Sequence, residues 1–203
     1  RPRPRRRRHE RHPGLSMPAP FLVLDGPDGC GKSTQARRLV RALRDRGHAV
    51  LHLREPGGTA IGERVRALLL DTAHGEMHIR AELLLFMASR AQLVEQIVRP
   101  ALAAGTVVVC ERFLTSSVVY QGIAGGLGAA TVWRLGKFAT GGLLPTLTLV
   151  LDVDARTGLS RVGRRPDRME RKTLSFHRAV RAGFRSLAKQ DPRRVRVLSS
   201  RGS

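Results

Sequence analysis

The stretch FLVLDGPDGCGKST, residues 21–34, limits the fold more than any other part of this 203-residue chain. A short apolar run typical of a buried strand leads into three glycines and then into a segment with helical spacing. Residues 26–33 match the pattern G-x-x-x-x-G-K-[ST] between a strand and a helix, the context that this pattern requires. A glycine-rich turn with a chance lysine would lack that context, so the chain is predicted to bind a nucleoside triphosphate.

The physical chemistry of this loop explains its composition. Glycines let the backbone curl so that successive N–H groups point at phosphate oxygens, and the following helix aims its positive end at the same anion. Lys32 is predicted to reach the outer phosphates, and the Ser33 hydroxyl is predicted to bind Mg²⁺. The predicted ATP phosphate contacts are Gly26, Pro27, Asp28, Gly29, Cys30, Gly31, Lys32, Ser33 and Thr34.

Apolar runs alternate with longer helical segments along the rest of the chain. One such segment, residues 81–105, ends at Gly105, a residue typical of helix ends. Alternation of this kind predicts an α/β fold, the P-loop NTPase three-layer α/β/α fold, with a five-stranded parallel sheet and a helical lid. The candidate strands are residues 21–25, 49–53, 106–111, 147–153 and 194–200.

The bulk composition adds few limits. Residues 1–16 are arginine-rich and of low complexity, and we expect a disordered basic tail before one kinase-sized domain over residues 17–203. The formal net charge of +21 raises the possibility of a nucleic-acid partner. Arginine greatly outnumbers lysine and only 4% of residues are aromatic, so nucleic acid is not the expected principal ligand.

The cysteine count and the apolar runs indicate the compartment. The chain has two cysteines, too few for a disulfide framework, which favours a cytoplasmic protein. No apolar run has the length of a membrane-spanning helix, so we expect no membrane partner.

Two further groups of residues point to a second ligand. Phe86 and Arg90 stand four positions apart, on one helical face, and an aromatic plane beside a guanidinium suits a nucleobase. A core phenylalanine beside a solvated arginine is the alternative. Glu111 and Arg112 follow an apolar run, where the acid can hold Mg²⁺ or its waters and the arginine can bind another phosphate.

In these motifs the chain resembles the thymidylate kinases, P-loop enzymes that phosphorylate dTMP to dTDP with ATP. The resemblance covers about residues 21–200 and rests, beyond the generic loop, on REPGGT, LLFMASRAQ, ERFLTSSVVYQG and GRRPDRMER in this order. It implies ATP and Mg²⁺ as cofactors and dTMP as substrate. It also implies a homodimer, packed on the apolar helix faces around residues 83–98, although the apolar pattern alone does not separate such a face from core.

The resemblance implies a role for each matching residue. Asp28 would accept from the 3′-hydroxyl of dTMP, and Phe86 would stack on thymine while Arg90 bonds its edge. Arg112 would bind the acceptor phosphate, and Tyr120 would crowd the sugar position that carries a 2′-hydroxyl in ribonucleotides. The implied dTMP-binding residues are Asp28, Arg54, Phe86, Arg90, Arg112, Ser116, Tyr120 and Gln121.

A lid over residues 161–173 would close on ATP. Because this phosphate loop has no cation before Lys32, the lid arginines Arg164, Arg165 and Arg168 would supply charge to the transferring phosphoryl group. The metal would be held by Ser33 and Glu111, since the competing acid Asp152 is expected to cap a helix. The implied catalytic residues are Lys32, Glu111, Arg112, Arg164 and Arg168.

The chain departs from the family pattern at Glu111, where aspartate is usual, and at Val119, where alanine is usual. Three alternatives to a dTMP kinase therefore stay open. One is a kinase for a modified deoxyuridine monophosphate. Another is a degenerate member that binds nucleotide with little turnover. The third is a nucleic-acid-associated ATPase, which the charge alone motivates.

Overall fold

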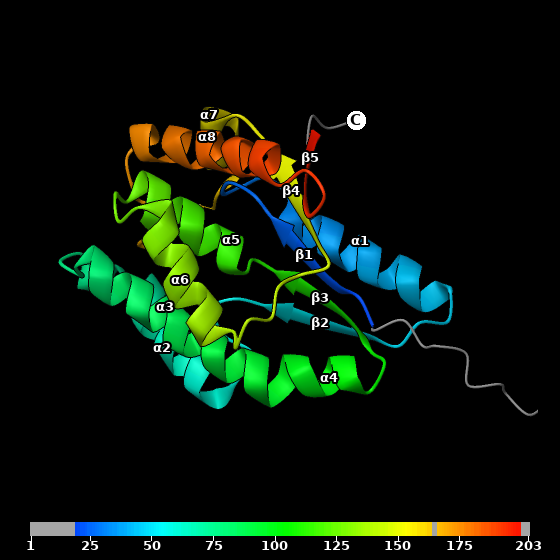
Figure 1. Cartoon of the computed structure of the whole chain (residues 1–203). Helices are drawn as coiled ribbons and strands as arrows, with labels where there is room; N and C mark the ends of the chain where they lie inside the picture. The colour runs from blue at the N-terminus through cyan, green and yellow to red at the C-terminus, as the bar shows by residue number, and fades with distance from the viewer. Residues whose placement is uncertain (1–18, 164–165, 200–203) are drawn as a thin grey trace, which may run out of the picture.

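The computed structural model describes residues 19–163 and 166–199, so the predicted basic tail, Arg164 and Arg165 lie outside the described residues. A five-stranded parallel sheet with strand order β2–β3–β1–β4–β5 forms its centre (Figure 1). The predicted strands are confirmed to within one residue at each end. They are β1 (Phe21–Asp25), β2 (Val50–Arg54), β3 (Val107–Glu111), β4 (Leu147–Asp152) and β5 (Val195–Ser199).

Helical segments connect these strands, as the alternation predicts. Short polar side chains begin several of them: the Thr59 side chain accepts from the N–H of Gly62 at the start of α2, and the Thr173 side chain accepts from the N–H of Phe176 at the start of α8. The α-helices are α1 (Lys32–Asp45), α2 (Ala60–Leu70), α3 (Ile79–Leu93), α4 (Arg99–Ala103), α5 (Leu114–Ser117), α6 (Ala129–Ala139), α7 (Ala155–Arg161) and α8 (Leu174–Gln190). Tighter or wider turns form η1 (Thr72–His74), η2 (Val94–Val98) and η3 (Val118–Ala124).

The sheet is covered on both faces. Helix α1 packs on one face through Ala36 and Val40, which contact Leu24, Val107 and Val109 of the strands. On the other face α3 to α6 and α8 enclose the larger core (Figure 1). Strands buried on both faces are apolar along their buried length, which is why β1 and β3 are apolar up to their last residue. The three-layer α/β/α fold is confirmed.

The long helical segment after η1 supplies core more than surface. Leu83, Leu93, Val94 and Val98 are buried, whereas Leu84 is 58% exposed. The apolar periodicity of residues 83–98 is therefore mainly that of a helix packed on the sheet. In the described part of the chain, no helix is both long and apolar enough to cross a membrane.

Candidate functional site

The phosphate loop joins β1 to α1 at the carboxyl ends of the strands, where parallel sheets place their ligand sites. Gly29 and Gly31 adopt positive φ angles of 69° and 87°. Gly29 also passes so close to α7 that a Cβ would lie 1.9 Å from the carbonyl oxygen of Gly158. Any larger residue at position 29 would push the loop off this helix, so the glycine is required by both conformation and packing.

Helix α1 begins at Lys32 without a side-chain cap and without an acidic residue in its first turn. Its first N–H groups therefore stay free for an anion. The Lys32 ammonium lies 3.3 Å from the carbonyl oxygen of Pro27 and 3.8 Å from a carboxylate oxygen of Asp28. Burial lowers the pKa of Lys32, and the nearby positive charge of Arg112 lowers it further. A phosphate bound beside Lys32 would favour its charged form.

Asp25, the last residue of β1, ties the loop to α5. Its fully buried carboxylate accepts hydrogen bonds from the Gly26 N–H at 2.9 Å and from the hydroxyls of Thr115 and Ser116 at 2.6 Å each. Several donors on one carboxylate fix the start of the loop against the segment that follows β3.

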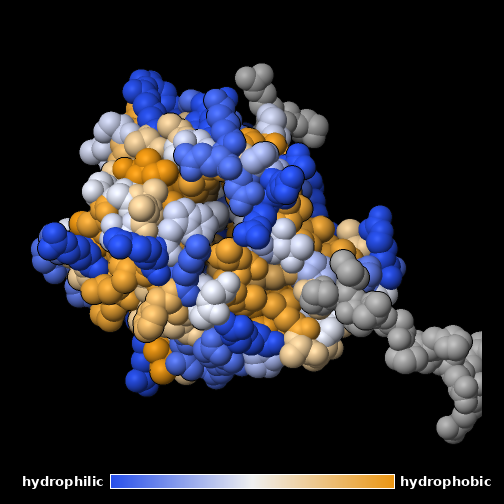
Figure 2. Space-filling model, viewed as in Figure 1, coloured by the Kyte–Doolittle hydropathy of each residue, from blue (hydrophilic) through white to orange (hydrophobic). Residues whose placement is uncertain are grey.

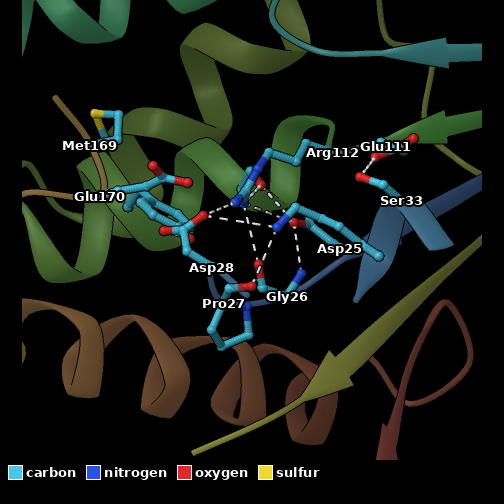
Figure 3. Close-up of polar contacts among 12 residues, drawn as sticks. Asp25, Gly26, Pro27, Asp28, Ser33, Glu111, Arg112, Met169 and Glu170 are labelled. Carbon is cyan, nitrogen blue, oxygen red and sulfur yellow. Dashed lines mark hydrogen bonds and ion pairs between the residues drawn. The ribbon is translucent and has the colours of Figure 1, made fainter. Parts of the chain in front are cut away.

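Arg112 turns back toward the loop just after β3 ends. Its φ angle is 66°, a left-handed conformation that is costly for a residue with a Cβ. The guanidinium donates to the carboxylate of Asp28, to Ser116 Oγ at 3.1 Å and to the Gly26 carbonyl at 3.3 Å. Figure 3 shows it pointing at Asp28, with Glu170 of the segment before α8 nearby. Strain of this kind is maintained where surrounding contacts hold a side chain in a working position.

Asp28 is surrounded by donors and positive charge. Tyr120 donates to it at 2.9 Å, and the buried His177 places Nδ1 3.7 Å from it. Burial alone would raise the pKa of Asp28, but Arg112, Lys32, Tyr120 and His177 outweigh it, and the pKa lies below its ordinary value. The same burial raises the pKa of Tyr120 well above its usual range. Asp28 is thus ionised and Tyr120 neutral near pH 7.

A second pair of side chains lies at the other end of the loop. The Ser33 hydroxyl donates to one oxygen of Glu111, and the other oxygen lies 3.0 Å from Nε2 of His52 (Figure 3 shows the Ser33–Glu111 pair). Hydroxyl and carboxylate oxygens are ligands that Mg²⁺ accepts, and such sites take one or two of them together with phosphates and water. Within residues 19–163 and 166–199 no cluster of three or more His, Cys, Asp or Glu side chains is arranged for a metal. Ser33 and Glu111 therefore fit a cation that arrives with a nucleotide.

These side chains surround one cavity of about 580 Å³. Its wall contains most of the residues predicted for the two ligands. They are Asp28, Gly29, Gly31, Lys32, Ser33, Thr34, Arg54, Phe86, Arg90, Glu111, Arg112, Ser116, Tyr120 and Gln121. Gly26, Pro27 and Cys30 lie in the loop but not on the cavity wall.

Phe86 and Arg90 both line the cavity. Arg90 is almost fully buried, and its Nε and Nη2 contact the same Glu55 carboxylate oxygen at 2.7 and 2.6 Å. It also donates to Ser117 Oγ and to the Phe113 carbonyl, both at 3.1 Å. The alternative of a solvated arginine is therefore excluded. Because its N–H groups already have protein acceptors, the Arg90 contact to a base edge stays a prediction.

The comparisons with known proteins agree with this geometry. The thymidylate kinase family model matches residues 24–203. The chain is 49% identical over 182 residues to a thymidylate kinase of Deinococcus radiodurans, covering 89% of this chain and 88% of that protein. It is 48% identical over 184 residues to one from a Synechococcus strain, covering 90% and 87%. A crystal structure of thymidylate kinase from Ehrlichia chaffeensis superposes with a TM-score of 0.74 at 30% identity, covering 90% of this chain and 93% of that one.

The chain belongs to the thymidylate kinase family. The segment that joins α7 to α8 corresponds to the lid that the resemblance implies. The described lid residues that line the cavity are Arg161, Val162, Gly163, Asp167, Met169 and Glu170. Arg164, predicted to be catalytic, lies outside the described residues.

The structure places Arg168 off the cavity wall, so its catalytic role stays a prediction. Its side chain is only 8% exposed and does not line the cavity. It donates to the Leu69 carbonyl at 2.8 Å and to the buried Glu82 at 2.6 Å, and Glu82 also accepts from Gln121 at 2.8 Å. The buried Glu82 carboxylate on α3 needs a paired cation, and Arg168 of the lid supplies it. No local sequence pattern indicates this pairing.

The prediction that Asp152 caps a helix is wrong. The cap of α7 is Asp154, whose side chain accepts from the Arg156 N–H at 3.0 Å. Asp152 ends β4 and binds the guanidinium of Arg181 through two hydrogen bonds of 2.7 and 2.9 Å. Asp152 is not among the residues that line the cavity.

Sequence reasoning missed several members of this thymidylate kinase site. Glu55 and Pro56 stand inside the REPGGT motif and follow Arg54 directly, so their position was a usable signal. Arg66 and His177 had none, because only the packing of α2 and α8 brings them close. Burial lowers the pKa of Arg66, whose guanidinium donates to the Pro56 carbonyl at 2.8 Å.

Proposed function

We propose that this protein transfers the γ-phosphoryl group of ATP to the 5′-phosphate of dTMP. The observation that carries the proposal is one cavity with two separate anion-binding features on its wall. The phosphate loop with Lys32 forms one, and Arg112, held in a strained conformation and aimed into the loop, forms the other. The names of the similar proteins support dTMP as the acceptor.

The residues act mainly by position and charge. Phosphoryl transfer asks the protein to align donor and acceptor and to balance the charge on the transferred group. The free N–H groups at the start of α1 and the Lys32 ammonium would hold the ATP phosphates, while Arg112 would hold the acceptor phosphate. An acceptor phosphate is already ionised near pH 7, so no strong general base is required.

Mg²⁺ would be held by Ser33 and Glu111 together with the nucleotide, where it supplies charge that neutralises the phosphate oxygens. Further positive charge is proposed to come from the lid, in which Arg161 lines the cavity. Arg164 stays a proposed member of that group.

The wall next to Arg112 is proposed to select the acceptor. Phe86 offers an aromatic face to a base, and the buried Tyr120 fills the space beside Asp28. A phenol in that position would crowd a ribose 2′-hydroxyl, which supports a deoxyribonucleotide acceptor.

An ADP-release assay with dTMP, dUMP, dCMP and dGMP tests the proposal. We expect dTMP to be the preferred acceptor. Preference for another nucleotide would favour a kinase for a modified deoxyuridylate, and ATP binding without turnover would favour a degenerate member. ATP hydrolysis stimulated by DNA without any acceptor would favour a nucleic-acid-associated ATPase.

We also propose a cytoplasmic homodimer. Both cysteines are buried free thiols, which supports a reducing compartment. Large apolar side chains are exposed on adjacent helices, with Ile61 on α2, Leu84 on α3 and Phe138 on α6 at 55%, 58% and 89%. Figure 2 shows apolar surface over the region where Figure 1 places α3 and α6. A second copy is the proposed cover, and a monomeric molar mass by light scattering would exclude it.

A further inference from the structure

His52 lies beside the acid that the proposed metal site depends on. Its Nε2 is 3.0 Å from one carboxylate oxygen of Glu111, and the two side chains are 26% and 13% exposed. A carboxylate accepts hydrogen bonds, so this contact is a hydrogen bond in the tautomer of His52 that carries a proton on Nε2. The other Glu111 oxygen accepts from the Ser33 hydroxyl. Both oxygens of Glu111 are thus held, each by a different strand or helix.

The strand register explains how this contact arises. Strands β2 and β3 are parallel, with His52 opposite Val109 and Arg54 opposite Glu111. Alternate residues of a strand point to the same face, so His52 and Glu111 are diagonal neighbours on the face that α1 covers. Diagonal neighbours in a sheet meet only through long side chains.

The length of residue 111 therefore matters. A glutamate spans the diagonal to His52 and still presents its second oxygen to Ser33. An aspartate would place its carboxylate about 1.5 Å closer to the backbone, roughly one C–C bond. From that position it would not keep both hydrogen bonds at their present lengths.

We infer that His52 is a positioning residue, which holds the Glu111 carboxylate against Ser33 and so shapes the site for the nucleotide-bound metal. His52 is not on the cavity wall, so it acts through Glu111 and not on a substrate. The inference rests on the proposed function only in that the metal enters with an adenine nucleotide. It also accounts for a glutamate at the end of β3, because the longer side chain reaches a hydrogen-bond partner in His52.

The first test compares two substitutions at His52. His52→Phe keeps the ring and removes the donor, whereas His52→Gln keeps an amide N–H near the position of Nε2. Binding of Mn²⁺ to the complex with ADP is followed by the loss of the free Mn²⁺ signal in electron paramagnetic resonance. We expect Mn²⁺ to bind at least tenfold more weakly to His52→Phe, the usual lower limit for loss of a partner that orients a metal ligand, and near-normal binding to His52→Gln.

The matched control is His48→Phe, at an exposed position just before β2. It should bind Mn²⁺ as the unchanged protein does. In steady-state assays His52→Phe should raise the Mg²⁺ concentration for half-maximal rate and leave the KM for dTMP unchanged, since the Arg112 side of the cavity is intact. A rise in both would mean a general loss of structure and would overturn the positioning role.

A double-substitution cycle with Glu111→Asp gives the decisive result. If His52 acts only through the glutamate, His52→Phe should weaken Mn²⁺ binding when Glu111 is present and have no further effect in the Glu111→Asp variant. Independent, additive losses would overturn the inference, as would unchanged Mn²⁺ binding in His52→Phe or absence of Mn²⁺ from the unchanged ADP complex. The titration needs no acceptor nucleotide, so its failure and a failure of the dTMP assay are told apart.

Discussion

Two arginine–carboxylate pairs line the same cavity, and they differ in how far they are sealed from solvent. Arg90 and Glu55 are 1% and 2% exposed, whereas Arg112 and Asp28 are 18% and 10% exposed. Arg90 sits within a regular helix and gives its N–H groups to protein acceptors. Arg112 has a left-handed backbone and faces the phosphate loop. The buried Arg90–Glu55 pair is typical of a contact that stabilises the fold. The more exposed Arg112–Asp28 pair, with its strained backbone, is typical of an anion-binding site.

The two acids differ in the same sense. Burial raises the pKa of Glu55 despite Arg90, and one of its oxygens has no hydrogen-bond partner. Burial also acts on Asp28, but several cations and a phenol hold its pKa down. Two carboxylates thus acquire opposite electrostatic settings from their surroundings alone. Both pairs consist of an arginine and a carboxylate, so residue type does not tell the structural pair from the ligand-binding pair. Side-chain exposure and backbone strain do.

Arg112→Ala should give the largest effect, on activity. The acceptor phosphate would lose its guanidinium, and arginines that stabilise a transferring phosphoryl group contribute roughly 10³-fold or more to the rate. We expect kcat with dTMP to fall by about that factor while ATP affinity stays within a few-fold, as measured by steady-state kinetics and fluorescence titration. Arg112→Lys is the matched control, which keeps charge without the fork. Equal loss of ATP binding and turnover would mean that Arg112 belongs to the ATP site.

Arg90→Ala should act mainly on stability. It would leave the Glu55 carboxylate buried without a cation, and breaking a buried pair in this way costs about 3–5 kcal/mol of unfolding free energy. Urea denaturation measures the loss. Arg112→Ala, unfolded under the same conditions, should lose less, because its partner Asp28 can recover water. If the two variants lost equal stability, the contrast between a sealed and an open pair would fail.

Local pattern predicted the parts of this molecule that depend on local pattern. The Val and Leu runs gave the strands, and the spacing of glycines, Lys32 and Ser33 gave the loop before α1. Properties set by distant packing were out of reach. The burial of Arg168 depends on Glu82, which is 86 positions away, and the His52–Glu111 contact depends on strand register. Neither contact can be predicted from the residues that neighbour Arg168 or Glu111 in the sequence.

Asp28 and Glu55 should change stability with pH in opposite directions, because their pKa values are shifted in opposite directions. Asp28 has a lowered pKa when folded, so its stabilising contribution is present above its ordinary pKa of 3.8 and is lost as pH falls through the folded value. Glu55 has a raised pKa, so its contribution is fully present below 4.5 and is lost as pH rises through the folded value.

A tenfold difference between the folded and unfolded acid dissociation constants corresponds to about 1.4 kcal/mol, so effects smaller than those of the arginine variants are expected. Asp28→Asn should lose less unfolding free energy than the unchanged protein on acidification from about pH 5 to pH 3, and Glu55→Gln should lose less on the rise above pH 4.5. Both follow from urea unfolding at a series of pH values. The two variants differ from the unchanged protein by one amide each, so parallel curves for both would show that their surroundings do not set these acids apart. A change of slope at Glu55 alone would mean that Asp28 behaves as an ordinary surface carboxylate. That result would contradict what its contacts with Arg112 and Tyr120 predict.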